Sequence, residues 1–375
     1  MSTPAHTDRK IRVAMIGHRG IPATYGGVER HVEELATRLV ALGFEVIVYC
    51  RSGYTPRMRE YRGIRIIRLP TINQKHLEMI AHTFLCVLDL LLRRRVDIVH
   101  IHSVDPALLT LPAGLAAKTV VTSHGQAYRR EKWGAFAKAM SLWAERVFTR
   151  WADGAISVSK TLRKYYKEKY GRDVTYIPNG VTISEPSGWN ELESLGLAPN
   201  RYVLYVGRLV PTKGAHMVIE AFGGLETDLT VAIAGGSSHT SEYVARLERM
   251  RNERVLLLGY QYGTALQQLY ENCRLFIMPS QIEGLPITLL EAMSYGRPIL
   301  FSDIPENMEA AEGVGVSFRS GDVADLREKM QYCLDHPDEL RELALKARER
   351  VIRDYTWDHV ADEHAKFYRE LLSKS

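Results

Sequence analysis

The sequence has few cysteines and no long uncharged apolar run, and each absence excludes a class of protein. Its 375 residues include four cysteines, which lie far apart and form no Cys-x-x-Cys pair. A disulfide framework and a cysteine zinc site are therefore not expected. No run of 18 or more uncharged apolar residues occurs, which argues against a transmembrane helix. The first ten residues are polar, so we expect no signal peptide and a protein that works in a reducing cytoplasm.

The net charge of +5 conceals opposite charges in the two halves of the chain. Residues 1–185 contain 29 Lys+Arg and 16 Asp+Glu, a balance of +13, whereas the remainder has a balance of −8. Such an imbalance indicates that the first half faces an anionic partner, such as a membrane surface, a phosphorylated substrate or a nucleic acid. Because no RNA-binding signature or helix-turn-helix pattern occurs, we expect no nucleic acid partner.

Short apolar runs alternate with segments of helical periodicity, and the alternation occurs twice. Strands are predicted over residues 11–16, 44–49, 64–69, 97–102, 118–123, 154–157 and 174–177, and then over 202–206, 229–234, 255–258, 275–278 and 298–301. Helices are predicted over 28–42, 75–95, 126–151, from a cap at Ser159 to Gly171, and over 357–372. Continuous apolar strands between helices are typical of parallel sheets covered on both faces. We therefore predict an α/β protein with two Rossmann-like doubly wound domains that face a cleft.

Two glutamates flank a predicted helix start in the second half. The segment from Glu283 to Glu291 follows a strand, and Pro286 suits the first helical position because it has no N–H to satisfy. The unpaired N–H groups behind it would form a phosphate site. Carboxylates beside such a site suit the hydroxyls of a sugar and a ribose. The alternative is an ordinary strand-to-helix turn with a capping acid.

Two further loops are rich in glycine and basic residues. Gly207 and Arg208 follow the strand over 202–206, and Lys213 comes five residues later. An arginine fork and a lysine point charge both suit a diphosphate, although a solvated basic loop is the alternative. Gly26 and Gly27 precede the helix predicted from Val28, where they permit close approach of the backbone to a ligand.

Together these motifs resemble the retaining glycosyltransferases of family 4, which have the GT-B fold and use nucleotide-sugar donors. The family's Glu-x7-Glu signature is matched by Glu283 and Glu291, and its Gly-Arg-x4-Lys motif by Gly207, Arg208 and Lys213. Its double glycine is matched by Gly26 and Gly27, and its histidine after a first-half strand by His124.

The first half also resembles transferases that build bacterial envelope polysaccharides, rhamnosyltransferases among them, through residues 20–29 and 130–134. The rhamnosyltransferase subset often has an acid at the position of His124, followed by Gly-Leu-Glu-Trp. This chain has His124 followed by Gly-Gln-Ala-Tyr, which disfavours rhamnose as the donor sugar.

The resemblance implies an acceptor-side domain over residues 1–180, a nucleotide-sugar domain over 181–355, and a helix within 356–375 that crosses back. Arg208 and Lys213 would hold the donor diphosphate, and Glu291 would bind the ribose. Glu283 would bind the donor sugar, beside whose anomeric centre His124 would lie. The other donor contacts implied are Gly26, Gly27, Gly207, Gly284, Leu285, Pro286 and Ile287. Retention is usually explained by same-face attack with the donor phosphate taking the acceptor's proton. No protein base, cofactor or metal is implied, and the nucleotide base stays open.

Three histidines allow a second interpretation. His100 and His102 alternate on a predicted strand, and with His124 they are candidate zinc ligands. No acidic partner stands nearby in sequence, so polar lining of the cleft is the favoured interpretation and we predict no metal site.

Basic and aromatic residues also concentrate in the first half. The segment over 126–151 mixes six basic residues with Trp133, Phe136, Trp143, Phe148 and Trp151. This composition suits a helix that lies on a membrane surface, and equally a core helix whose aromatic residues face the sheet. The basic run from Arg51 to Lys75 is interpreted as a solvated hairpin.

The sequence thus predicts a transferase that moves a sugar from a nucleoside-diphosphate sugar to a lipid-linked or oligosaccharide acceptor in bacterial polysaccharide or glycoconjugate synthesis. We expect it in the cytoplasm, peripherally bound to an anionic inner membrane face. The alternatives are a nucleotide-sugar epimerase of the same fold and an inactive membrane-associated scaffold.

Overall fold

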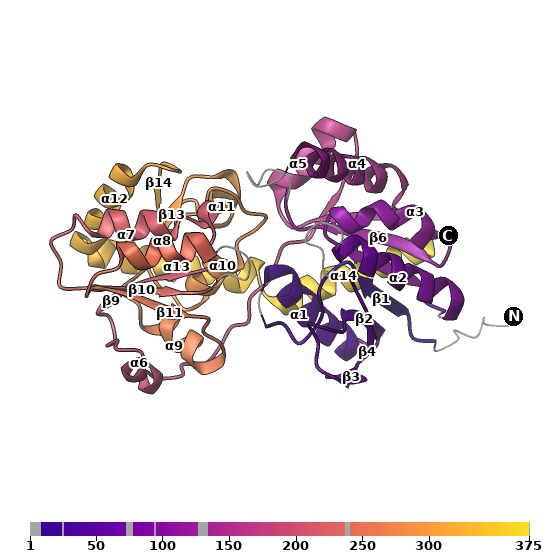
Figure 1. Ribbon diagram of the computed structural model, residues 1–375, viewed down its shortest axis with the longest axis horizontal. Coiled ribbons are helices and arrows are strands. Elements are labelled where there is room, and N and C mark those ends of the chain that lie inside the picture. Colours follow the sequence, from indigo (N-terminus) through magenta and orange to yellow (C-terminus); the bar gives the residue numbers. More distant parts are fainter. Residues whose placement is uncertain are drawn as a thin grey trace, which may run out of the picture. The chain divides into compact units, whose positions relative to one another are not determined.

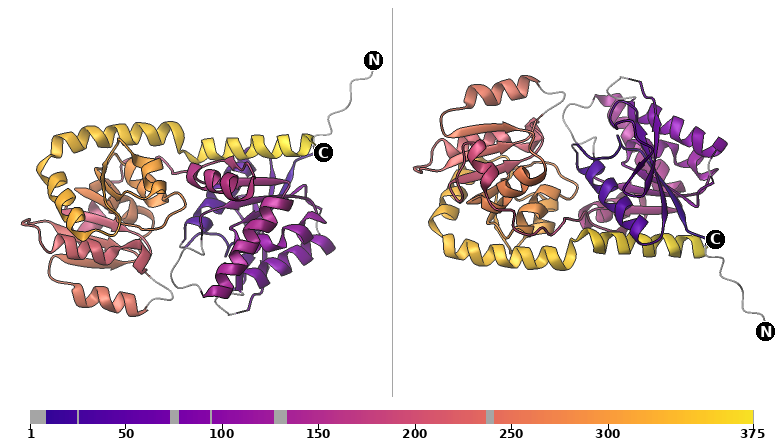
Figure 2. Two further views of the ribbon diagram at one scale, coloured as in Figure 1. Left: turned by 90° about the horizontal axis from the view of Figure 1, so that it is seen from above. Right: turned by 90° about the horizontal axis from the view of Figure 1, so that it is seen from below.

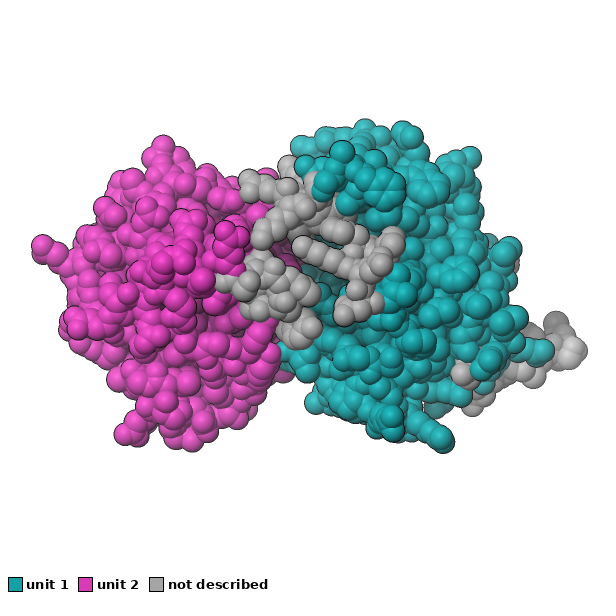
Figure 3. Space-filling view, in the orientation of Figure 1, with its two compact units in different colours: residues 1–179, 357–375 teal, residues 180–356 magenta. Residues whose placement is uncertain are grey.

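The chain divides into two compact units, each with its own sheet. The computed structural model describes residues 9–24, 26–72, 78–93, 95–126, 134–236 and 241–374. Unit 1 comprises residues 1–179 and 357–375, and unit 2 comprises residues 180–356 (Figure 3). Within unit 2, the Val181 N–H donates to the Tyr355 carbonyl at 2.8 Å, so the two ends of this unit lie side by side.

Unit 1 is built on an eight-stranded sheet in the order β3-β4-β2-β1-β5-β6-β7-β8 (Figure 1). Its strands are β1 (Arg12–Ile16), β2 (Glu45–Arg51), β3 (Glu60–Tyr61), β4 (Ile64–Leu69), β5 (Ile98–His102), β6 (Lys118–Ser123), β7 (Gly154–Ser157) and β8 (Thr175–Tyr176). Neighbouring strands are parallel except β3 and β4, which are antiparallel and lie within the basic run interpreted as a solvated hairpin. Its arginines at 57, 59, 62 and 65 are exposed, as a solvated hairpin requires.

The helices of unit 1 lie on both faces of this sheet. They are α1 (Gly27–Ala41), α2 (Glu78–Arg93), the 3-10 helix η1 (Asp105–Leu109), α3 (Thr110–Gly114), α4 (Ala135–Trp151), α5 (Lys160–Tyr170) and α14 (Trp357–Ser373). Although α14 comes from the far end of the chain, it packs against α1 (Figure 2). An ion pair between Arg38 Nε and Asp358 Oδ1 at 2.6 Å joins the two helices.

The ends of α5 follow the predicted capping pattern. Ser159 Oγ accepts a hydrogen bond from the Leu162 N–H at 3.2 Å, and Gly171 ends the helix with a φ of 68°. Both residue types suit these positions, since a serine hydroxyl caps the first N–H groups and glycine adopts the left-handed conformation without strain.

The long helix predicted over 126–151 is wrong in its N-terminal part. Helix α4 begins at Ala135, and its N-cap Gly134 has an extended backbone with φ −63° and ψ 163°. Gln126 lies outside any helix, and residues 127–133, which include Arg129, Arg130, Lys132 and Trp133, lie outside the described residues. Glycine is a poor helix former, which explains a boundary at this position.

Unit 2 is built on a six-stranded parallel sheet in the order β11-β10-β9-β12-β13-β14. The strands are β9 (Tyr202–Val206), β10 (Thr230–Ala234), β11 (Val255–Gly259), β12 (Leu275–Met278), β13 (Ile299–Ser302) and β14 (Val316–Phe318). The helical segments are α6 (Asn190–Ser194), the 3-10 helix η3 (Pro211–Lys213), α7 (Ala215–Phe222), α8 (Ser241–Met250), α9 (Gly263–Asn272), α10 (Ile287–Ser294), α11 (Pro305–Ala311), α12 (Val323–Asp335) and α13 (Pro337–Asp354). The short edge strands β3 and β14 were missing from the prediction.

The predicted α/β class with two parallel, Rossmann-like sheets is confirmed. The strands are buried because helices cover both faces of each sheet, which accounts for their continuous apolar sequences. Across the described part of the chain, no helix combines the length and the apolar character that crossing a membrane requires.

Candidate functional site

The strand order of unit 2 reverses between β9 and β12. From β9 the sheet continues to β10 and β11 on one side, and from β12 to β13 and β14 on the other. The loops that leave the carboxyl ends of these two neighbouring strands therefore diverge, and in doubly wound sheets a ligand binds at such a switch point. The predicted residues Gly207 to Lys213 lie in the loop after β9, and Glu283 to Ile287 lie in the loop after β12.

Lys213 and Glu283 are brought together at this switch point, although 70 residues separate them. Lys213 Nζ donates to Glu283 Oε1 in a short ion pair. The side chains are only 17% and 9% exposed, so water screens the pair weakly. The backbone supports the contact, since the Gln281 N–H donates to the Thr212 carbonyl at 2.9 Å.

Glycines allow the loops after neighbouring strands to approach closely. A Cβ on Gly214, whose φ is +74°, would lie 2.7 Å from the Pro279 carbonyl oxygen. A Cβ on Gly235, just after β10, would lie 1.8 Å from the carbonyl oxygen of the predicted residue Gly207. No larger residue fits at either position, so these glycines determine where the predicted loops lie.

Helix α10 begins behind Glu283, one residue later than predicted. Pro286 is its N-cap, with an extended backbone, and Ile287 is the first helical residue. The first N–H groups of any helix have no partner within the helix, and Pro286 leaves this arrangement intact because it lies before them. Gly284 is half-buried and Leu285 is buried in the same loop.

Glu291 is held by a tyrosine that sequence reasoning missed. The hydroxyl of Tyr270 on α9 donates to Glu291 Oε2 at 2.9 Å. Tyr270 is buried and stacks on Tyr295, with ring centroids 5.8 Å apart. Burial and the Glu291 carboxylate both raise the pKa of Tyr270, so its hydroxyl keeps its proton and remains a donor. No spacing in the sequence connects positions 270 and 291.

Arg208 lies on the same loop as Lys213 but is exposed to solvent. Its carbonyl accepts a hydrogen bond from the buried Tyr205 hydroxyl at 3.2 Å, which positions the backbone and leaves the guanidinium at the surface. Unit 2 therefore presents two basic side chains and two carboxylates at one sheet edge. Basic side chains suit phosphate groups, and carboxylates suit hydroxyl groups.

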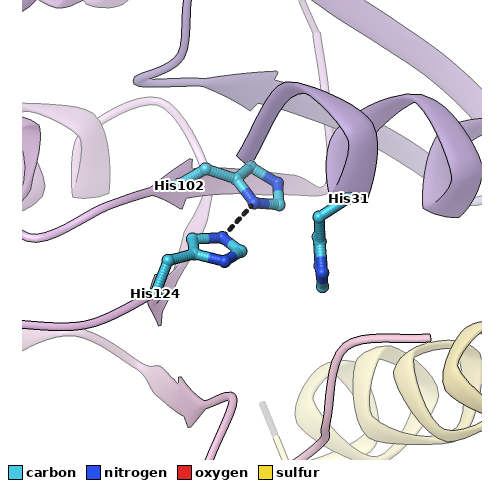
Figure 4. Close-up of side chains that lie close together, drawn as sticks. All are labelled: His31, His102 and His124. Carbon is cyan, nitrogen blue, oxygen red and sulfur yellow. Dashed lines mark hydrogen bonds between the residues drawn. The ribbon is translucent and has the colours of Figure 1, made fainter. Parts of the chain in front are cut away.

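In unit 1, the predicted residue His124 belongs to a cluster of histidines (Figure 4). His124 follows β6, His102 ends β5, and His31 lies on α1. His102 Nδ1 and His124 Nε2 lie 3.3 Å apart, within hydrogen-bonding distance. His31 Nδ1 lies 3.0 Å from Asn179 Oδ1 and therefore donates to it. Among the described residues, the Nε2 atoms of His31 and His102 have no hydrogen-bond partner.

Burial keeps these imidazoles neutral. Burial, followed by repulsion from His364, lowers the pKa of His124 to about 3. Burial likewise lowers the pKa values of His31 and His102 well below 6.5, with neighbouring histidines as the second cause. A neutral histidine can donate and accept hydrogen bonds, so this cluster suits hydroxyl groups rather than anions.

Of the three histidines considered as zinc ligands from the sequence, His102 and His124 remain candidates in the structure, whereas His100 does not. Both ring nitrogens of His100 are within hydrogen-bonding distance of other groups, at 2.7 Å from Thr122 Oγ1 and from the Tyr368 hydroxyl. His31 takes its place, and one ring nitrogen from each of His31, His102 and His124 lies within 4.8 Å of the others. Tetrahedral zinc requires nitrogens about 3.3 Å apart. A metal would therefore have to displace the proton between His102 and His124 and draw His31 closer.

The double glycine begins α1, as the sequence suggested. Gly26 is the N-cap with a φ of 101°, and Gly27 is the first helical residue. A Cβ on Gly26 would lie 2.2 Å from Glu29 Oε2, which binds the Arg19 N–H through its other oxygen at 3.3 Å. Tyr25, which precedes them, lies outside the described residues.

We expect Gly214→Ala to lower the free energy of unfolding by more than Gly196→Ala does. Both glycines have φ near +70°, which costs roughly 1 kcal/mol for alanine. Only at Gly214 would the new Cβ also meet backbone atoms within 3 Å, because the nearest atom to it at Gly196 is 3.9 Å away. Urea denaturation of both variants measures the difference. Equal losses would contradict the close contact between the loops after β9 and β12.

The buried histidines predict that acid destabilises the fold. In the folded protein the pKa values of His18 and His124 are lowered from 6.5 to about 3. Below pH 6.5 the unfolded chain therefore binds more protons than the folded protein does. Stability is then fully present above pH 6.5 and decreases as the pH falls, by up to about 2 kcal/mol per such histidine between pH 7 and pH 5. Urea denaturation across this range checks the decrease, and His18→Gln should reduce its slope. A flat profile would contradict the neutral cluster.

Comparison with known proteins agrees with this geometry. Residues 25–185 match the family described as Glycosyltransferase Family 4, and residues 189–350 match Glycosyl transferases group 1. A glycogen synthase of Mycobacterium tuberculosis is 28% identical over 398 residues, which cover 96% of this chain and 94% of that protein. A phosphatidyl-myo-inositol mannosyltransferase of Mycobacterium leprae is 25% identical, with 93% and 94% covered.

A solved structure resembles the whole chain. Sucrose-phosphate synthase from Thermosynechococcus elongatus superimposes with a TM-score of 0.83 at 21% identity, covering 98% of this chain and 100% of its own. At this sequence identity the structural similarity indicates the fold alone, which is GT-B. The two family matches cover consecutive halves of the chain, and the motif residues of unit 2 lie together at its switch point. The chain therefore belongs to glycosyltransferase family 4, the retaining GT-B transferases that use nucleoside-diphosphate sugars.

Proposed function

We propose that this transferase moves a hexose from a nucleoside-diphosphate sugar to a lipid-linked or saccharide acceptor in the synthesis of a bacterial polysaccharide or glycoconjugate. The observation that carries the donor assignment is the convergence of Lys213 and Glu283 at the β9/β12 switch point, with Glu291 on the helix that follows. The names of two relatives point to acceptors of both kinds, since glycogen is a saccharide and phosphatidyl-myo-inositol is a lipid.

Donor binding would exchange the partner of Lys213. In the structure its ammonium group bonds to Glu283. A diphosphate carries more negative charge than one carboxylate, so Lys213 would turn to it, and Glu283 would become available to accept sugar hydroxyls. Arg208, which is exposed on the same loop, would add a second cation. Both charges stabilise the leaving nucleotide as the glycosidic bond breaks, and electrostatic stabilisation of this kind is often the largest contribution to catalysis.

Glu291 would bind the ribose, with Tyr270 as a positioning residue. The Tyr270 hydroxyl holds one carboxylate oxygen of Glu291 in a fixed orientation. A fixed carboxylate loses less conformational entropy when it accepts the two ribose hydroxyls. Gly207, Gly284, Leu285, Pro286 and Ile287 would contribute backbone groups to the donor site.

His124 would contact the donor sugar as a neutral hydrogen-bonding group. Its low pKa is unsuited to a general base near pH 7, because a base of pKa about 3 takes up a proton too weakly. The proton of the acceptor hydroxyl would therefore go to a donor phosphate oxygen, on the face from which the leaving group departs. Gly26 and Gly27 would allow the loop before α1 to approach the phosphates.

The acceptor would be presented at the anionic inner face of the cell membrane. The first 185 residues carry a balance of +13, which attracts an anionic surface. Phe136, Trp143 and Trp151 on α4 are exposed, whereas Phe148 is buried. Of the two interpretations of this segment, the exposed aromatic residues favour membrane contact and Phe148 belongs to the core.

Incubation with a panel of radiolabelled UDP-, ADP-, GDP- and dTDP-hexoses tests the function, with bacterial membrane lipid extract or oligosaccharides as acceptors. A labelled lipid or saccharide together with free nucleoside diphosphate supports the proposal, and the product's anomeric configuration reports retention. An altered sugar nucleotide would indicate an epimerase. The absence of any product with every donor would support the alternative of an inactive scaffold.

We expect Lys213→Ala and Arg208→Ala each to lower kcat by on the order of 10²-fold, because each removes a positive charge beside the leaving group. Arg201→Ala is the matched control. Arg201 is also a partly exposed arginine of unit 2, but it pairs with Asp228 at the start of β9, away from the switch point. Circular dichroism of each variant checks that it is folded. Near-normal kcat in both Lys213→Ala and Arg208→Ala would remove the diphosphate role.

Tyr270→Phe should weaken the affinity for the free nucleoside diphosphate by about three- to tenfold, because Glu291 loses a hydrogen bond that orients it. Tyr202→Phe is the control, since Tyr202 is equally buried and donates to the Leu269 carbonyl at 2.7 Å rather than to Glu291. Isothermal titration calorimetry measures both affinities. Equal losses in the two variants would mean that Tyr270 is structural only.

A further inference from the structure

One layer of helices in unit 1 has an apolar outer surface. Nine large apolar side chains on this layer are between 42% and 80% exposed. They are Phe84, Leu88, Leu91 and Leu92 on α2, Leu111 and Leu115 on and just after α3, and Phe136, Trp143 and Trp151 on α4. Scattered single apolar residues are normal at a surface, whereas a group of this size marks a contact surface.

These side chains belong to neighbouring helices on one face of the sheet. Helices α2, α3 and α4 are labelled in Figure 1, and α3 contacts both α2 and α4. The 3-10 helix η1 contacts all three. The opposite face of the sheet carries α1 and α14, which pack against each other. The right-handed crossovers explain this division, because the chain runs from β1 to β2 in one direction and from β4 through β8 in the other.

Helix α2 is apolar on two sides. Its residues at 83, 86, 87 and 90 are buried against the sheet. At 100° per residue, the exposed residues Phe84, Leu88, Leu91 and Leu92 fall within an arc of about 100° on the other side. A helix that only packs on a core needs no such second stripe.

The exposed charges on this layer are basic. On α4 they are Lys138, Arg146 and Arg150, and Arg93 and Arg95 lie at the end of α2. On the helical wheel, Arg146 and Arg150 lie next to Phe136 and Trp143. The acidic residues of α2 and α4 that the structure describes are engaged instead. Glu145 is fully buried and accepts bonds from Tyr165 and Tyr170, and Asp89 accepts one from Tyr49. Glu78, at the start of α2, is partly exposed but forms an ion pair with Arg51 at 2.8 Å.

We infer that the outer face of α2, α3 and α4 is the surface by which the enzyme docks on an anionic lipid bilayer. The inference rests on the proposed function in taking the acceptor to be presented at a membrane, and it names the surface that reaches it. Leucines and phenylalanines would enter the acyl region, the tryptophans would lie at the headgroups, and Arg146 and Arg150 would meet lipid phosphates.

Charge favours a bilayer over a second copy of the chain. In a two-fold dimer the same patch would meet itself, so the basic residues of one copy would face a surface that is also basic. Like charges at an interface oppose association, whereas anionic headgroups attract all of them at once.

Vesicle co-sedimentation tests the surface, with vesicles of phosphatidylcholine alone or mixed with phosphatidylglycerol. The wild type should bind the mixed vesicles, and binding should decrease as salt rises because screening weakens the attraction. Leu88→Gln with Leu92→Gln should reduce the partition coefficient by at least about tenfold, because two apolar side chains no longer enter the bilayer. Arg146→Gln with Arg150→Gln should remove the preference for phosphatidylglycerol.

Leu345→Gln with Ile352→Gln is the matched control. These two residues are exposed to 55% and 47% on α13 of unit 2, which is not part of the proposed surface, and their replacement should leave the partition coefficient unchanged. Equal binding of the wild type and the Leu88/Leu92 variant would overturn the inference. So would a wild-type dimer in analytical ultracentrifugation that this variant dissociates, because the face would then be a protein interface.

Hydrolysis of the donor sugar in the absence of vesicles separates this inference from the proposed function. If the Leu88/Leu92 variant hydrolyses the donor at the wild-type rate but no longer binds vesicles, the docking surface is supported. If wild-type protein hydrolyses the donor but binds no vesicle, the docking surface fails and the donor assignment stands. If it binds vesicles as described but turns over no donor, the proposed function fails and the surface stands.

Discussion

The reversal of strand order between β9 and β12 is the constraint on which the site of unit 2 depends. Two parallel strands that lie side by side, but whose chains leave in opposite directions, place their outgoing loops at one edge without obstruction. Lys213 and Glu283 meet there across 70 residues of sequence. The contact needs these loops to come within van der Waals distance, which Gly214 makes possible because it has no Cβ. Gly235 in the same way lets the loop after β10 approach Gly207.

The two units use polar groups in different ways. Unit 2 places charged side chains at a sheet edge, where a nucleoside diphosphate could exchange with the carboxylate that holds Lys213. Unit 1 places neutral imidazoles at the carboxyl ends of β5 and β6, where burial keeps His102 and His124 uncharged at neutral pH. The first arrangement suits phosphate groups, and the second suits hydroxyl groups.

The helices on the two faces of the unit 1 sheet differ in how much apolar surface they expose. On one face, α14 packs beside α1, and aromatic rings such as Trp357 and Tyr368 are fully buried there. On the other face, α2, α3 and α4 bury one side against the sheet and leave leucine, phenylalanine and tryptophan on the outside. The residues buried against the sheet form the core that stabilises the unit. The exposed apolar residues add nothing to this core, so they require an explanation other than stability.

The sequence by itself determined the parallel α/β class, most strands and the motif residues, because buried strands and glycine-rich loops leave local patterns. Glu283, Lys213 and the cap at Ser159 were identified in this way, and His124 through the resemblance to the family. Only the tertiary structure decided which distant residues meet. The bond from Tyr270 to Glu291, the approach of His31 to His102 and His124, and the outward stripe of α2 leave no spacing that a linear pattern could reveal. In α2 both stripes are apolar, so periodicity alone could not distinguish the side that faces the sheet from the side that faces out.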